Sequence, residues 1–230
     1  MQSGIDTMIF DLDGTLLNTL TDLTNSVNYA LEKYQLPTYC EDEVCQMVGN
    51  GVTRLMERAI PGGRSFEKFD DCLRDFKKHY EIHKKDFTKP FPGILDFLKE
   101  AKESGFQLAV VSNKFDLAVK GLCRDFFAPY ITTAIGESPK VAPKPAPDTV
   151  YKAMEELHSS QKQCIYIGDS DVDIVTAKNA GIPCISVSWG FRSRQFLKLH
   201  GAAAIADNVE ELKRLIYSSS STSNSSSSSP

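Results

Sequence analysis

The stretch Met8-Ile9-Phe10-Asp11-Leu12-Asp13-Gly14-Thr15 decides how this chain folds. Its first three residues are apolar and predict a short buried strand. Two aspartates follow, with a glycine that favours a turn. Because residues i and i+2 of a strand point to the same side, the carboxylates of Asp11 and Asp13 are expected to face one site. Taken alone, such a pair is as typical of a solvated acidic turn as it is of a functional site.

Further apolar runs of strand length follow along the chain. They cover residues 107–112, 131–135, 164–168 and 183–187, with a weaker candidate at 202–206. Helical patterns separate most of these runs, at residues 94–104, 117–126, 148–157 and 172–180. Strands that alternate with helices imply parallel strands joined by right-handed crossovers. The sequence therefore predicts an α/β fold with a doubly wound, mainly parallel sheet.

Residues 18–85 interrupt this alternation, which predicts an inserted helical cap. The segment has helical patterns at 21–34, 42–60 and 66–84 and no convincing strand. The catalytic core would then consist of residues 1–17 and 86–217, with two prolines in the return linker at 86–93. The last thirteen residues, 218–230, are nearly all serine and predict a disordered tail.

Composition narrows the class of partner. A net charge of -4 argues against nucleic acid or an anionic membrane as the main partner. The six cysteines form no C-x-x-C pair, which favours reduced thiols. The N-terminus does not resemble a signal peptide, and no apolar run approaches the roughly 20 residues that span a bilayer. We expect a cytoplasmic protein, monomeric or homodimeric, that does not bind membranes or nucleic acid.

A second strand, at residues 164–168, also ends in carboxylates, those of Asp169 and Asp173. In a parallel sheet the carboxyl ends of strands share one edge, so these side chains should face Asp11 and Asp13. Carboxylates that close together repel one another, and a divalent cation removes the conflict. Ligands that are all oxygen favour magnesium over zinc. For Asp173 the alternative is a stabilising position in the first turn of a helix.

Two other segments could hold an anion. Ser112 and Asn113 follow a predicted strand, where a hydroxyl and backbone N–H groups can bind phosphate oxygens. Lys144 lies between two prolines just before a helix, and its ammonium could stabilise a transferring phosphoryl group. The alternatives are an ordinary helix cap for Ser112 and a solvated loop position for Lys144.

Together these elements resemble the haloacid-dehalogenase-like (HAD) superfamily of phosphohydrolases in order and spacing. The elements are Asp11-x-Asp13-Gly14-Thr15, Ser112, Lys144 and Gly168-Asp169-Ser170-x-x-Asp173. The resemblance extends to about residue 217. It implies a Rossmann-like HAD core with a helical cap. More narrowly, residues 48–51, 55–59, 112–114, 144–148 and 189–191 resemble phosphoglycolate phosphatases. Asn18 departs from the aspartate that relatives commonly carry, which concerns the hinge or cap.

The resemblance implies a chemistry for each motif. Asp11 would attack phosphorus to form an aspartyl-phosphate, while Asp13 would protonate the leaving alkoxide and later accept a proton from water. Mg²⁺ would be bound by Asp11, Asp169 and the backbone carbonyl of Asp13, with Asp173 supporting the metal or Lys144. Ser112 and Lys144 would hold the phosphoryl oxygens. Because true dehalogenases do not carry the second aspartate, Asp13 indicates a phosphate ester.

The expected activity is hydrolysis of a small phosphorylated metabolite, phosphoglycolate first. The alternatives are a pyrophosphatase, a nucleotidase or a sugar-phosphate mutase of the same superfamily, and more distantly a non-catalytic binding or regulatory protein. Candidate substrate contacts are Thr15, Gly49, Asn50, Asn113 and Arg54, with Arg58 and Lys33 as further cap cations. His79 and His83 have a spacing compatible with metal binding, but a solvated cap helix is the simpler reading.

Overall fold

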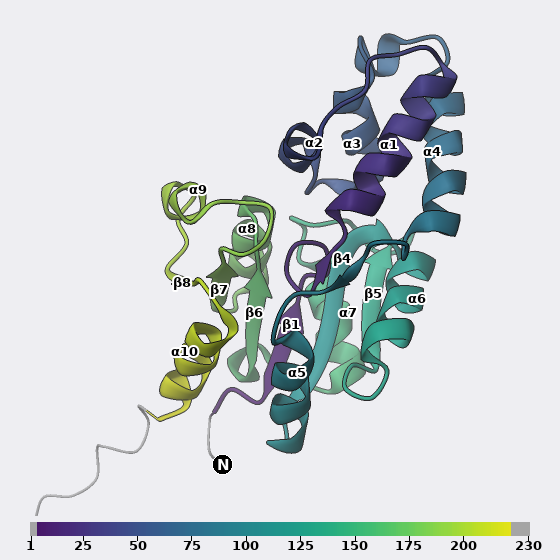
Figure 1. The fold of residues 1–230 in the computed structure, drawn as a ribbon. Helices are drawn as coiled ribbons and strands as arrows, with labels where there is room; N and C mark the ends of the chain where they lie inside the picture. The colour runs from purple at the N-terminus through teal and green to yellow at the C-terminus, as the bar shows by residue number, and fades with distance from the viewer. Residues whose placement is uncertain (1–3, 222–230) are drawn as a thin grey trace, which may run out of the picture. The chain divides into compact units, whose positions relative to one another are not determined.

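The computed structural model describes residues 4–221, and the chain divides into two compact units. The first unit contains the chain up to Leu16 and from Pro92 onwards. The second unit comprises Leu17–Phe91. Figure 1 shows the elements of both units.

The first unit is built on a six-stranded sheet in the order β5-β4-β1-β6-β7-β8. Each neighbouring pair of strands is parallel. The strands are β1 (Thr7–Phe10), β4 (Gln107–Phe115), β5 (Thr133–Glu137), β6 (Cys164–Gly168), β7 (Cys184–Val187) and β8 (Ala204–Ala206). Successive crossovers run outward from β1 in one direction through β4 and β5 and then in the other direction from β6. This arrangement confirms the predicted doubly wound parallel sheet, with β1 beside the point where the strand order reverses.

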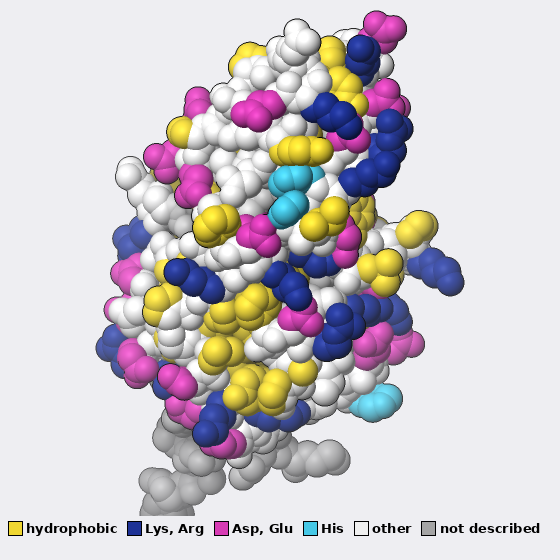
Figure 2. Space-filling view, turned by 45° about the vertical axis from the view of Figure 1, so that its right-hand side comes forward, with side chains coloured by type: hydrophobic (Ala, Val, Ile, Leu, Met, Phe, Trp, Pro, Cys, Tyr) yellow, Lys and Arg dark blue, Asp and Glu magenta, His cyan; other side chains and the backbone are white. Residues whose placement is uncertain are grey.

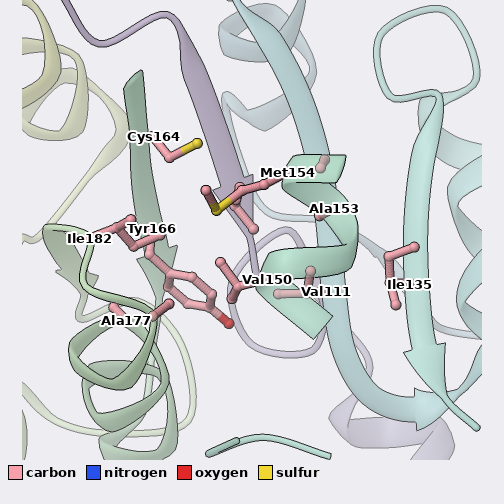
Figure 3. Close-up of a cluster of buried hydrophobic side chains, with 12 residues drawn as sticks. Val111, Ile135, Val150, Ala153, Met154, Cys164, Tyr166, Ala177 and Ile182 are labelled. Atoms are coloured by element: carbon pink, nitrogen blue, oxygen red, sulfur yellow. The ribbon is translucent and has the colours of Figure 1, made fainter. Parts of the chain in front are cut away.

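Helices cover both faces of this sheet. The helices of this unit are α5 (Ile94–Glu103), α6 (Asp116–Phe127), α7 (Asp148–Leu157), α8 (Asp171–Ala180), α9 (Arg194–Leu199) and α10 (Val209–Ser221), with a short 3-10 helix at Gln161–Gln163; α5, α6, α7, α8 and α10 contact the strands. Helices α7 and α8 contact each other, as do α5 and α10. The apolar side chains of β1 alternate between the faces: Phe10 packs edge-on against Phe97 of α5, and Ile9 joins a cluster with Val150 of α7. Figure 3 shows this second cluster.

The second unit is mainly helical. Its helices are α1 (Leu20–Lys33), α2 (Glu41–Met47), α3 (Gly51–Ala59) and α4 (Phe69–His83), with a 3-10 turn at Gly63–Ser65. The helical pattern expected at 42–60 is therefore two helices and not one. The break falls where Gly49 and Gly51 adopt φ values of 126° and 80°, which a right-handed helix does not allow.

Two short strands that the sequence did not predict join the ends of this unit. Strand β2 (Leu17–Asn18) pairs antiparallel with β3 (Lys89–Pro90). Two-residue strands leave no alternation of polar and apolar residues to recognise. The buried carboxylate of Asp22 in α1 reinforces the connection, because it accepts hydrogen bonds from the backbone N–H groups of Phe87 and Thr88, at 2.9–3.2 Å.

The end of the chain differs in part from the expected tail. Helix α10 continues through Ser221, into the serine-rich stretch, and residues 222–230 lie outside the described part. Among the helices of the described residues, none combines the length and the apolar character that crossing a membrane requires.

Candidate active site

Asp11 and Asp13 follow the end of β1, as their spacing predicts. Asp11 is buried, and its backbone N–H donates to the carbonyl of Ile167 in β6. Gly14 then turns the chain with φ of 86°, and a Cβ atom there would lie 2.3 Å from Oδ2 of Asp169. Only glycine combines this backbone conformation with so close an approach. The turn therefore brings the first motif against the carboxylate that follows β6.

Three carboxylates meet beside this turn. One oxygen from each of Asp11, Asp169 and Asp173 lies within 4.8 Å of the other two. The paired register of β1 and β6, with Phe10 opposite Ile167, aligns the two strand ends. Asp173 comes from the first turn of α8, and a Cβ on Gly168 would lie 2.4 Å from the Cβ of Asp173. Asp13 is not part of the cluster, since its carboxylate has another partner.

The electrostatics of this cluster suit a divalent cation. Burial raises the pKa of Asp11 to about 7, although Lys144 opposes the shift, and the charge of Asp173 adds to it. Burial and the neighbouring carboxylates also raise the pKa of Asp169 well above its usual value. Each raised pKa means that the ionised carboxylate lacks the solvent or positive charge that would stabilise it. Oxygen donors from carboxylates are the ligands that magnesium prefers, so the residues present fit such an ion.

Lys144 supplies the positive charge at the same place. Its Nζ lies 2.8 Å from Oδ1 of Asp11 and 2.8 Å from Oδ1 of Asp173. Burial would lower the pKa of this ammonium, but the two carboxylates outweigh that effect and raise it. Lys144 is therefore a charged group in the interior and not the solvated loop lysine of the alternative interpretation.

The side chain of Asn113, a predicted substrate contact, holds the backbone of Lys144. Its Oδ1 accepts from the backbone N–H of Lys144 at 2.7 Å, and its Nδ2 donates to the carbonyl of the same residue at 2.9 Å. Both polar ends of the amide are thus used to fix one loop residue. The strand end that carries Asn113 and the loop that carries Lys144 are therefore joined directly by hydrogen bonds.

The strand that carries Ser112 is longer than expected and adds an unassigned residue to the site. Strand β4 runs to Phe115, and Ser112 Oγ accepts from the backbone N–H of Lys114 at 3.2 Å. The buried Nζ of Lys114 donates to both carboxylate oxygens of Asp13, at 2.9 and 2.8 Å. The sequence contained a clue, because residues 112 and 114 share the i, i+2 relation of side chains on one side of a strand.

Thr15 likewise contacts the acidic cluster. Its Oγ1 donates to Oδ1 of Asp169 at 3.2 Å, and its carbonyl accepts from Nε1 of Trp189 at 3.0 Å. The other oxygen of Asp169 accepts from the backbone N–H of Phe191 at 2.7 Å. Asp169 is therefore held in place by residues that follow β1 and β7.

The candidate cations of the second unit all have partners within that unit. Arg54 forms an ion pair with Glu57 at 2.7 Å. Arg58 donates to the carbonyl of Met47 and to Oδ1 of Asn50, each at 2.6 Å, and so braces the turn that contains Gly49. Lys33 lies 2.9 Å from Oδ2 of Asp75. These contacts shape the unit, and the substrate role of its cations remains a prediction.

The histidine pair forms a ring stack in the second unit. The rings of His79 and His83 stack with centroids 4.2 Å apart, and Tyr29 stacks on His79 at 4.1 Å. Nδ1 of His79 lies 3.0 Å from Ser26 Oγ, and Nδ1 of His83 lies 2.7 Å from Asp86. Figure 2 shows two adjacent histidine side chains at the surface. Within residues 4–221, the carboxylate cluster is the one group of three or more ligand residues that meets metal-site geometry.

A doubly wound sheet with a strand-end aspartate, a buried lysine and a carboxylate cluster at one edge defines a class of hydrolases. The family model for haloacid dehalogenase-like hydrolases matches residues 8–187. The chain belongs to this family, which confirms the resemblance drawn from its motifs.

Individual relatives and a solved structure indicate which members of this family the chain resembles. A phosphoglycolate phosphatase of Aquifex aeolicus is 33% identical over 80% of this chain and 85% of its own length. The pyrophosphatase PpaX of Halalkalibacterium halodurans is 30% identical over 84% of this chain and 88% of its own length. A crystal structure from Lactobacillus delbrueckii subsp. bulgaricus, inferred to be a phosphoglycolate phosphatase, superposes with a TM-score of 0.89 at 36% identity, covering 93% of this chain and 98% of that one. Within its family, the chain thus resembles phosphoglycolate phosphatases.

Proposed function

We propose that this chain is a magnesium-dependent phosphatase that hydrolyses a small phosphorylated metabolite, phosphoglycolate first, through an aspartyl-phosphate. The observation that carries the proposal is the contact of Asp11 Oδ1 with the buried Lys144 ammonium, at 2.8 Å, beside the carboxylates of Asp169 and Asp173. A nucleophilic carboxylate needs compensating positive charge before it can approach a phosphate dianion.

The first step transfers the phosphoryl group to the protein. A carboxylate oxygen of Asp11 forms a bond to phosphorus while the bond from phosphorus to the ester oxygen breaks. The electron pair of that bond leaves with the alkoxide, which takes a proton from Asp13. The positive charge of Lys144 would stabilise the phosphoryl oxygens as charge develops on them, and the hydroxyl of Ser112 would assist it.

The second step restores the enzyme. Water attacks phosphorus and gives a proton to Asp13, the bond to Asp11 breaks, and inorganic phosphate leaves. A magnesium ion would be held by Asp11, Asp169 and the backbone carbonyl of Asp13, with Asp173 behind them. When bound, it supplies charge compensation between carboxylates and phosphate.

Lys114 bears on the role of Asp13, because its ammonium donates to both carboxylate oxygens, at 2.9 and 2.8 Å. These contacts orient the carboxylate that would give a proton to the leaving group and later accept one from water.

We also propose that residues 18–85 act as a cap that selects the substrate. Phosphoglycolate carries a carboxylate in addition to its phosphate, and a cation or a set of backbone N–H groups would recognise it. Arg54 and the turn at Gly49 and Asn50 remain the candidates. Removing the charges of Arg54, Arg58 and Lys33 one at a time should raise KM for phosphoglycolate at the residue responsible. Unchanged KM values in all three would reject a cap cation.

Pyrophosphate is a second candidate substrate. The similarity to the pyrophosphatase of Halalkalibacterium halodurans, at 30% identity, favours its inclusion. The same site chemistry would serve both substrates, because each presents a phosphoryl group with an oxygen leaving group.

The direct test is release of inorganic phosphate by the purified chain from a panel of phosphorylated metabolites, with phosphoglycolate and pyrophosphate included. We expect magnesium-dependent turnover that is highest with phosphoglycolate. Formation of an isomer without free phosphate would indicate a mutase. Absence of turnover across the panel and with a generic phosphate ester would favour a non-catalytic protein.

A further inference from the structure

Tyr166 is a buried polar residue that the proposed chemistry does not use. It lies in β6 with no exposed surface, two residues before Gly168. Its ring belongs to an apolar cluster that includes Val150 and Ala177, from the helices on that face of the sheet. Figure 3 shows the ring among these side chains, with its oxygen at the far end. A hydroxyl in such surroundings is costly unless it forms hydrogen bonds.

The hydroxyl of Tyr166 meets this requirement by bonding to two charged groups. It donates to Oδ1 of Asp173 at 2.9 Å and accepts from Nζ of Lys144 at 3.1 Å. Burial, followed by the charge of Asp173, raises the pKa of this phenol well above its usual value, so it remains a neutral hydroxyl. It can therefore donate to the carboxylate and accept from the ammonium at the same time.

These bonds complete the coordination of the Lys144 ammonium. An ammonium group has three protons. Nζ of Lys144 has three oxygen partners within hydrogen-bond distance, on Asp11 and Asp173 at 2.8 Å and on Tyr166 at 3.1 Å. Two of these partners lie away from the reacting atoms. They direct the remaining proton toward the nucleophile and, in turn, toward a phosphoryl oxygen.

Asp173 has its own support, which makes the arrangement rigid. Its Oδ2 accepts from the backbone N–H of Ser170 at 3.1 Å and from the Ser170 hydroxyl at 2.6 Å. Its Oδ1 is shared by Lys144 and Tyr166. Without the phenol, Lys144 would keep Asp11 and Asp173 as partners but would lose the contact that limits its rotation between them.

We propose that Tyr166 is a positioning residue for the phosphatase reaction, whose hydroxyl holds the Lys144 ammonium in the orientation required for phosphoryl transfer. The inference rests on the proposed function, because it assigns Lys144 to the phosphoryl group. The Tyr166 hydroxyl forms no hydrogen bond to the nucleophile, because its partners are Asp173 and Lys144, and in the proposed reaction it does not contact the substrate.

The chain offers a matched control in its second unit. Tyr34 donates to Oδ2 of Asp75 at 2.8 Å, and Lys33 lies 2.9 Å from the same oxygen. Tyr34→Phe therefore removes a hydroxyl that donates to an aspartate paired with a lysine, as Tyr166→Phe does, but this hydroxyl forms no hydrogen bond to the lysine. Tyr166→Phe and Tyr34→Phe would be compared with the wild type for kcat, KM and melting temperature, using phosphoglycolate and a generic phosphate ester.

We expect Tyr166→Phe to lower kcat by about tenfold, the scale of one hydrogen bond to a charged group, with little change in KM. Tyr34→Phe should keep the wild-type kcat. The second measurement is a double-mutant cycle with Lys144→Met. If the phenol acts through the ammonium, Tyr166→Phe should have no further effect on the residual rate of Lys144→Met. A general loss of structure would lower both rates by the same factor.

Several outcomes would overturn the proposal. They are a wild-type kcat in folded Tyr166→Phe, an equal loss in Tyr34→Phe, and a Tyr166→Phe effect that persists in Lys144→Met. If Tyr166→Phe does not fold, Tyr166→Met carries the same test, and failure of both to fold would make the hydroxyl a folding determinant. The proposed function fails separately, by absence of phosphate release from the wild type.

Discussion

The described residues contain a lysine–aspartate–tyrosine triad in each unit, and the two triads differ in burial. In the first unit, Lys144 and Asp173 have side chains that are 3% and 0% exposed, and Tyr166 is fully buried. In the second unit the side chains of Lys33 and Asp75 are 51% and 12% exposed. The lysine–aspartate and tyrosine–aspartate distances are nearly the same in the two triads, but only Tyr166 also accepts a hydrogen bond from its lysine.

Their surroundings do separate them. The Lys33 ammonium is half exposed and pairs with one carboxylate, that of the mostly buried Asp75, so the two charges balance and water screens the ammonium. The Lys144 ammonium instead bonds two carboxylates, with Asp169 as a third beside them, in a place where water cannot compensate the excess. The same residue types therefore support a helix packing contact in one unit and a reactive centre in the other.

The largest expected effect comes from removing the nucleophile of the buried centre. Asp11→Asn should reduce turnover to background, because an amide does not attack phosphorus and form the covalent intermediate. Asp75→Asn makes the same change in the exposed triad and should keep the wild-type kcat. Phosphate release measures activity, and circular dichroism checks the fold. Activity close to that of the wild type in Asp11→Asn would reject its assignment as nucleophile.

Removing the ammonium from each triad gives the next largest effect. Lys144→Met should lower kcat by about 10³-fold, since it removes the charge that stabilises the phosphoryl oxygens. It should also lower the melting temperature, because it leaves buried carboxylates uncompensated. Lys33→Met should lower kcat and stability much less, because the Lys33 side chain is 51% exposed and water screens its ion pair. Equal losses in both variants would mean that burial does not decide their roles.

Metal removal should expose the charge imbalance of the buried centre. The raised pKa of Asp11, about 7, means that the folded state holds its proton more tightly than the unfolded state. In the presence of a chelator, the free energy of unfolding should therefore fall as pH rises from about 4 toward 7. Added Mg²⁺ should restore several degrees of melting temperature at neutral pH. Asp169→Asn should weaken this magnesium effect, and Asp75→Asn should not. An unchanged melting temperature with Mg²⁺ would contradict the metal site.

The exposed triad should respond to pH with the opposite sign and the smallest amplitude. Hydrogen bonds from Lys33 and Tyr34 lower the pKa of Asp75, so its carboxylate stabilises the fold while it is charged. That contribution is present above the ordinary aspartate pKa, about 3.9, and is lost as pH falls through the lowered value. The melting temperatures of wild type and Asp75→Asn should differ by no more than about 2 °C at pH 6 and converge near pH 3.

Sequence patterns predicted the fold well where a strand or helix repeats over several residues. The apolar runs that became β1, β4, β5, β6 and β7 were each recognised, because parallel strands are buried on both faces. The break between α2 and α3 was less visible, since glycines lie inside a region with helical periodicity on both sides. The pairing of β2 with β3 was not predicted at all.

The sequence predicted which residues belong to the site better than it predicted the hydrogen bonds between them. Asp11, Asp13, Asp169 and Asp173 were expected to face one another at one edge of the sheet. The structure groups the first, third and fourth of these with Lys144, whereas Asp13 pairs with Lys114. Lys114 was not predicted as a partner of Asp13, because the two residues lie 101 positions apart in the sequence. The side chains of Asn113 and Thr15 hold Lys144 and Asp169, which the sequence did not reveal, and their contacts with substrate stay predictions.

By itself, the sequence determined that strands would alternate with helices and that carboxylates would follow two of the strands. Those conclusions depend on local periodicity and on the shared edge of a parallel sheet, which short segments encode. Only the tertiary structure decided which lysine–aspartate–tyrosine triad would be buried. It also decided that Tyr166, which lies in an apolar strand, would form a hydrogen bond with Lys144. Burial and hydrogen-bond geometry depend on residues far apart in the chain, so no single segment contains them.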